Sequence, residues 1–157
     1  MAEVKPIPDD YPQVMPYLHV DGAADAIGFY EKVFGATERM RMPDPSGKIG
    51  HAELQLGDSV IMLADEYPDM GIRGPAAYGG SGVTISVYVE DVDAVFQRAV
   101  DAGAKVVRDL ENQFYGDRSG QFEDPFGHRW SVASRVEDVP SDEMERRAAE
   151  AMRGAAG

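Results

Sequence analysis

This chain contains an internal sequence repeat of two copies. The pattern of residues 20–36 recurs in residues 89–104, and the pattern of residues 50–57 recurs in residues 120–127. The two copies keep the same order and are offset by 68 to 70 residues. Two copies predict an internal pseudo-twofold arrangement with a ligand cleft between them, whereas a solenoid needs at least three repeats.

The residue pattern of each copy predicts a β-α-β-β-β unit. Apolar residues at three- and four-residue spacing predict a helix over 22–35, which Gly35 is placed to end. Alternating polar and apolar residues over 49–56 predict a strand, and a hairpin signal at Gly57 follows it. The predicted strands are 14–20, 37–42, 49–56 and 59–64 in the first copy and 83–89, 105–110, 120–123 and 128–135 in the second, whose helix is predicted over 91–102.

The copies define the domain organisation. Residues 1–13 form a proline-containing lead-in, and the C-terminal helix and tail occupy 136–157. The domain between them spans 14–135, with module one at 14–64, a connection at 65–82 and module two at 83–135. The connection is long and rich in Gly and Pro, so we expect it to be mobile or to cover a site.

Composition limits the partners and the location. The 157 residues include no cysteine and carry a formal net charge of -13. Such an acidic surface repels phosphate backbones and anionic lipids, so neither nucleic acid nor membrane is expected as a partner. The absence of cysteine and of a long apolar stretch favours a cytoplasmic protein. Open sheet edges and a weak apolar stripe on the last helix predict a homodimer.

Two motifs carry a family resemblance. The helix Ile27-Gly-Phe-Tyr-Glu-Lys-Val-Phe-Gly35 and the hairpin Asp124-Pro-Phe-Gly-His-Arg-Trp130, within the duplicated units, resemble the vicinal oxygen chelate (VOC) superfamily. That superfamily includes glyoxalase I, extradiol dioxygenases and bleomycin-resistance proteins, and the chain is most similar to its small bacterial glyoxalase-like branch. The resemblance covers about residues 14–153. It implies an α+β fold in which two tandem βαβββ modules form curved mixed sheets around a cup-shaped cleft.

The resemblance also points to the positions of metal ligands. The metal-using families take ligands from the first and last strands of each module, which here correspond to Met15, Met62, Thr84 and Ser131. Two thioethers and two hydroxyls are a poor ligand set for Zn, Ni, Mn or Fe(II). We therefore expect no metal and no other cofactor at this centre.

Strand alternation selects other residues for the cup. It places His51 and Glu53 on the cup face, as a candidate catalytic pair for proton transfer. The candidate ligand-binding residues on the same face are Tyr17, His19, Gln55, Met62, Tyr88 and Arg129. In this arrangement a small organic molecule is expected between Tyr17 and Tyr88.

Two function classes remain open. The first is a glyoxalase/bleomycin-resistance-like protein that binds a drug or metabolite in a metal-free cup between the modules, since aromatic and Met lining with few polar groups is usual for such pockets. The alternative is a lyase, isomerase or dioxygenase that uses His51 and Glu53, or an atypical metal site made by His19, His51 and Glu53.

Overall fold

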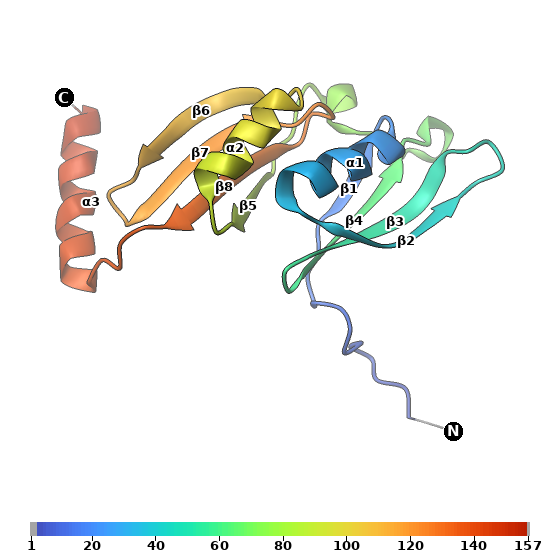
Figure 1. Cartoon of the computed structure of the whole chain (residues 1–157), viewed down its shortest axis with the longest axis horizontal. Coiled ribbons are helices and arrows are strands. Elements are labelled where there is room, and N and C mark those ends of the chain that lie inside the picture. The colour runs from blue at the N-terminus through green and yellow to red at the C-terminus, as the bar shows by residue number, and fades with distance from the viewer. Residues whose placement is uncertain (1–2, 157) are drawn as a thin grey trace.

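Each sequence copy folds into a four-stranded mixed sheet that carries one helix. The computed structural model describes residues 3–156, and Figure 1 shows the two sheets side by side along the long axis. Module one contains β1 (Tyr17–Val20), α1 (Ala23–Phe34), β2 (Thr37–Pro43), β3 (Ile49–Leu56) and β4 (Ser59–Asp65). Module two contains β5 (Thr84–Tyr88), α2 (Val92–Asp101), β6 (Lys105–Asn112), β7 (Asp117–Glu123) and β8 (Arg129–Arg135).

The two sheets have the same topology. The strand order is β1-β4-β3-β2 in module one and β5-β8-β7-β6 in module two. In each sheet the first strand runs parallel to the last, and the other neighbours are antiparallel. The predicted α+β class with two βαβββ modules is therefore confirmed.

Two strands begin three residues away from their predicted starts, for local reasons. The first begins at Tyr17 rather than at residue 14, because Pro16 has no backbone N–H for the ladder, although its carbonyl accepts a bond from Met62 N. β7 begins at Asp117, three residues before the predicted start, directly after a turn in which Gly116 adopts φ 99°.

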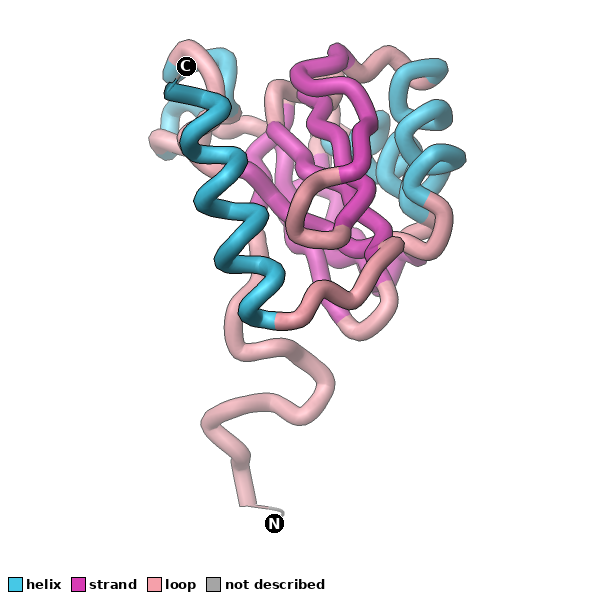
Figure 2. Tube along the Cα trace, turned by 90° about the vertical axis from the view of Figure 1, so that its left-hand side faces the viewer, coloured by secondary structure: helices cyan, strands magenta, loops and turns pink. Residues whose placement is uncertain are grey.

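The remaining segments lie outside the two sheets. The connection contains two short 3-10 helices, Pro68–Met70 and Pro75–Tyr78, and the chain ends in α3 (Ser141–Ala156). Figure 1 shows α3 at one end of the molecule beside module two, and the N-terminal segment leaving module one. In Figure 2, α3 lies on the opposite side of the strands from α1 and α2. No helix among residues 3–156 is long and apolar enough to cross a membrane.

One hydrophobic core joins the two modules. Phe34 of α1 packs against Trp130 of β8, with ring centroids 4.7 Å apart. Beside this pair, the Tyr30 hydroxyl and the Trp130 indole N–H both donate to Asp124 Oδ2, at 2.5 and 2.9 Å. The buried Asp124 carboxylate therefore links the helix of module one to the last hairpin of module two. This core leaves the sheet faces away from α1 and α2 available for other contacts.

Candidate functional site

Four side chains form a continuous hydrogen-bonded chain on module one. The Tyr17 hydroxyl lies 2.8 Å from His51 Nδ1, and His51 Nε2 lies 2.8 Å from Glu53 Oε2. The Tyr11 hydroxyl donates to the second Glu53 oxygen at 2.7 Å. In the neutral imidazole, Nε2–H donates to Glu53 while Nδ1 accepts from Tyr17, so each ring nitrogen has one partner. The two predicted catalytic residues are thus in direct contact.

Strand geometry explains why these groups share one face. In β3, Ala52 and Leu54 are fully buried in the core against α1. His51 and Glu53 alternate with them along the strand, so their side chains point to the opposite side of the sheet. We call this side, with Tyr17, His51, Glu53 and Met62, the open face of module one. Tyr17 pairs with Met62 and Met62 with Glu53 across neighbouring strands, so the three residues stand in one row.

A β-bulge adds a cation to the chain. The β2–β3 pairing passes from Glu38 opposite Leu54 to Met40 opposite Glu53, which leaves Arg39 as the extra residue. Arg39 Nε lies 4.0 Å from Glu53 Oε1, and Nη1 donates to the Asp10 carbonyl at 3.2 Å. The guanidinium therefore ties the N-terminal segment to the carboxylate.

The surroundings keep Glu53 ionised. Only 4% of the residue is exposed, and this burial by itself would raise the pKa of the carboxyl group. Hydrogen bonds from His51 and Tyr11, together with the charge of Arg39, outweigh burial and lower the pKa below its ordinary value. Burial and the nearby Glu53 charge raise the pKa of Tyr17, so its hydroxyl remains a proton donor at neutral pH.

A cavity of about 400 Å³ adjoins this chain. Glu53, Met62 and Met15 form part of its wall, and the N-terminal segment forms the rest. The lining from that segment consists of Pro6, Ile7, Pro8, Tyr11, Pro12 and Gln13. Residues predicted as a lead-in therefore cover the open face of module one and complete a largely apolar pocket with a carboxylate in it.

The other predicted ligand-binding residues lie elsewhere. The His19 ring meets the Tyr17 ring edge-on at 5.5 Å and lines a different cavity. Gln55 donates its side-chain amide to the Gly57 carbonyl at the next turn. Arg129 lies in module two opposite Thr84 in the β5–β8 pairing. The Tyr88 hydroxyl donates to Asp117 Oδ2, also within module two, at 2.7 Å.

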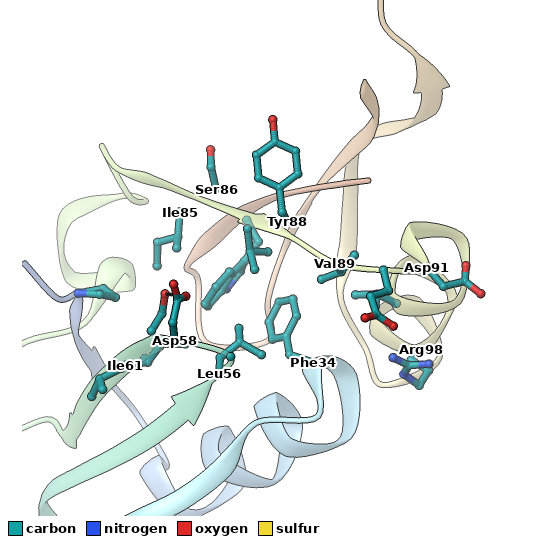
Figure 3. A pocket seen from close by; sticks show the side chains of 18 residues that line it. Phe34, Leu56, Asp58, Ile61, Ile85, Ser86, Tyr88, Val89, Asp91 and Arg98 are labelled. Atoms are coloured by element: carbon teal, nitrogen blue, oxygen red, sulfur yellow. Dashed lines mark hydrogen bonds between the residues drawn. The ribbon is translucent and has the colours of Figure 1, made fainter. Parts of the chain in front are cut away.

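Tyr17 and Tyr88 therefore line different cavities in the part of the chain that the structure describes. Tyr88 belongs to a cavity of about 780 Å³ at the junction of the modules, whereas Tyr17 lines the cavity that contains His19. Figure 3 shows Phe34 and Leu56 on one side of β5 in the junction cavity, with the Tyr88 side chain pointing away from them. The junction cavity thus lies between the two modules, next to the shared core. The expected ligand site between Tyr17 and Tyr88 stays a prediction.

The residues at the family's metal-ligand positions do not fit a metal. Met62 lines the 400 Å³ cavity and offers only a thioether, and Thr84 and Ser131 contribute only hydroxyls from the other module. This donor set lacks the imidazoles and carboxylates that Zn, Ni, Mn and Fe(II) prefer. Within residues 3–156, no group of three His, Asp or Glu side chains is arranged to hold a metal, so His19 does not join His51 and Glu53 in a triad.

Two residues of the site escaped the sequence analysis. Tyr11 lies in a proline-containing segment without strand or helix periodicity, so no pattern signals which way it points. Arg39 reaches Glu53 only because of the bulge in β2, and simple alternation cannot predict a bulge. Neither residue had a usable signal in a single sequence.

Comparisons with known proteins agree with this architecture. The family model described as the Glyoxalase/Bleomycin resistance protein/Dioxygenase superfamily matches residues 12–132. The uncharacterized protein Rv0887c of Mycobacterium tuberculosis is 49% identical over 137 residues, covering 85% of this chain and 81% of its own.

Solved structures show the same fold. The gene product At5g48480 of Arabidopsis thaliana is 31% identical, with a TM-score of 0.63 over 78% of this chain and 98% of its own. TioX from Micromonospora sp. ML1 is 26% identical, with a TM-score of 0.61 over 80% of this chain and 99% of its own. The match of the family model across both modules, together with these relatives, confirms the resemblance seen in the sequence. The chain belongs to the glyoxalase/bleomycin resistance protein/dioxygenase superfamily.

Proposed function

We propose that this protein binds a small organic molecule on the open face of module one, without a metal ion, as a cytoplasmic homodimer. The observation that carries the proposal is the chain from Tyr11 through Glu53 and His51 to Tyr17, beside a largely apolar cavity of about 400 Å³. Ligand pockets commonly have this size and combine an apolar lining with a few oriented polar groups.

The lining favours a flat ligand. Met15 and Met62 supply thioethers, which adapt to irregular shapes and make favourable contacts with ring edges. The Tyr11 ring in the cavity wall offers an aromatic surface worth about 0.5–1.5 kcal/mol per stacked pair beyond burial. A planar drug or metabolite therefore suits this pocket better than a highly charged one.

The polar chain would orient this ligand. In the neutral form of His51, Nε2–H donates to Glu53. The other ring nitrogen, Nδ1, then accepts a hydrogen bond from the Tyr17 hydroxyl. A ligand N–H or O–H can take the place of the Tyr17 hydroxyl on Nδ1 when the tyrosine ring turns aside. The tyrosine then gains freedom to pack against the ligand.

A titration with matched variants tests this proposal. Planar metabolites and antibiotics are screened by thermal shift, and a hit is titrated by calorimetry against the wild type, Glu53→Gln and Glu123→Gln. Glu123 is the control, because it occupies the position of Glu53 in the second copy of the repeat. We expect Glu53→Gln to weaken binding at least tenfold, because it removes a charged partner worth about 1.5–3 kcal/mol, and Glu123→Gln to bind like the wild type.

Two results would contradict the proposal. Equal affinity in Glu53→Gln and the wild type would place the ligand elsewhere. One Zn, Ni, Mn or Fe per chain after mild purification, lost together with ligand binding on chelation, would contradict a metal-free site.

The same chain of hydrogen bonds supports a second candidate, a lyase or isomerase that works by proton transfer. An ionised carboxylate beside an imidazole is a common acid–base pair. Incubation of a hit in D₂O distinguishes the candidates, because an enzyme of this kind exchanges a ligand C–H for deuterium and the His51→Gln variant does not.

A further inference from the structure

A second cavity lies beneath the connection between the modules. It measures about 290 Å³ and shares no lining residue with the Glu53 cavity. Its walls come from β1, the connection and the turn before β8. The side chains that line it include Tyr17, His19, Arg73, Pro75, Tyr78 and His128.

The cavity is lined by basic side chains, although the molecule as a whole is acidic. The chain has 28 acidic and 15 basic residues, yet the lining contains Arg73, His19 and His128 and no Asp or Glu. Among residues 3–156, the Arg73 guanidinium has no carboxylate within ion-pair distance and the His19 ring makes no hydrogen bond. The nearby Glu66 carboxylate is engaged by Gly74 N at 3.0 Å. The Arg73 guanidinium and the His19 ring, both without a partner among these residues, thus line the same cavity.

Close backbone contacts hold the cavity in shape. His128 Nε2 donates to the His19 carbonyl at 3.0 Å, which joins the last hairpin of module two to β1. A side chain at Gly74 would approach that same carbonyl to 2.9 Å, and one at Gly127 would approach Pro75 to 3.0 Å. The connection therefore packs directly on both modules at this point, with glycines at the two tightest contacts.

We propose that this cavity is a binding site for a small organic anion with an aromatic or apolar body. Arg73 forms the charge-assisted hydrogen bonds to a carboxylate or similar group, as guanidinium groups do in many anion sites. His19 adds a neutral or charged N–H donor, and Tyr17, Tyr78 and Pro75 contact the apolar body. The site is distinct from the Glu53 cavity and does not depend on the function proposed for that cavity.

Three histidines make the test specific. The chain contains only His19, His51 and His128, so imidazole NMR signals report separately on the two sites once single His→Gln variants have assigned them. Benzoate is the anionic probe, benzamide the neutral probe of the same shape and benzylamine the cationic probe. We expect benzoate, but neither of the others, to shift the His19 and His128 signals, and added NaCl to weaken the effect.

A charge-matched pair of variants completes the experiment. Arg73→Gln is expected to weaken benzoate binding about tenfold, whereas Lys32→Gln, on the exposed side of α1, leaves it unchanged. Equal shifts with benzamide, unmoved His19 and His128 signals, or full benzoate affinity in Arg73→Gln would each overturn the proposal. A failure here leaves the Glu53→Gln titration unaffected, because that titration concerns a different cavity and a different ligand.

Discussion

Glu53 is an almost fully buried carboxylate that nevertheless stays charged. Three neighbours make this tolerable: hydrogen bonds from His51 and Tyr11 satisfy its two oxygens, and Arg39 brings a positive charge within 4.0 Å. A buried charge without such partners is strongly unfavourable. The folded protein therefore depends on Glu53 being ionised, and that dependence predicts how stability changes with pH.

The pKa of Glu53 is lower in the folded chain than its ordinary value of 4.5. Its contribution to stability is therefore fully present above about pH 4.5 and is lost as the pH falls through the lower folded value. We expect the difference in unfolding free energy between the wild type and Glu53→Gln to shrink between about pH 5 and pH 3. Urea unfolding followed by the fluorescence of the buried Trp130 measures it. A difference that stays constant over this range would show that Glu53 is not held ionised.

Sequence reasoning reached part of this site and not the rest. Alternation around the buried Ala52 and Leu54 was enough to place His51 and Glu53 on the same face, because β3 is regular along these residues. Arg39 escaped it because a bulge shifts the period by one residue, and Tyr11 because a segment without periodicity gives no direction. The hydrophobic pattern predicted the regular strands and helices. The pocket is completed by the bulge at Arg39 and by the long-range contact between Tyr11 and Glu53, which this pattern does not encode.

At the scale of elements, the two modules differ in how closely their helices approach the sheet. The repeated motif places a glycine at Gly50 in β3 and at Gly120 in β7. A Cβ at Gly120 would lie 2.8 Å from Phe96 Cε2 and 3.1 Å from the Arg108 carbonyl. At Gly50 the nearest atom, the Met42 carbonyl oxygen, would lie 3.7 Å away, which is an ordinary contact. α2 therefore packs on its strand without room for a side chain.

This difference predicts responses of different size to the same substitution. Gly120→Ala is expected to destabilise the protein by about 1–3 kcal/mol, because Phe96 and the β6 backbone must move to admit the methyl group. Gly50→Ala is the matched control and is expected to change stability much less. Thermal and urea unfolding of both variants measure the effect. Equal stability of the two variants would contradict the close packing of α2 on β7.

At the scale of the whole molecule, the shared core fixes the direction in which the two modules face. The hydrogen bonds from Tyr30 and Trp130 to Asp124 hold α1 against the last hairpin of module two. Figure 2 shows the helices of both modules on one side of the strands. The faces that bear Tyr17 and Tyr88 consequently lie on the other side and do not close on each other within one chain. A cup that contains both tyrosines then requires a second copy.

This geometry and the exposed apolar stripe of α3 support the proposed homodimer. α3 is held to the body by Arg147, through the Glu137 carboxylate and the Phe114 carbonyl, while Met152 is 74% exposed. In a twofold dimer, each module two would face the module one of the other copy, and α3 would cover part of the contact. Stable interfaces of this kind bury about 1,200–2,000 Å² in total.

Light scattering after size exclusion tests the assembly directly. At micromolar concentration we expect a mass of twice 17.1 kDa for the wild type. Met152→Gln should shift the equilibrium toward the monomer, because it replaces an apolar contact with an amide that must lose water on association. Arg153→Gln, its neighbour outside the stripe, should leave the equilibrium unchanged. A wild-type mass of 17.1 kDa at these concentrations would rule out the dimer, and the ligand would then have to be held by the open face of module one and the N-terminal segment alone.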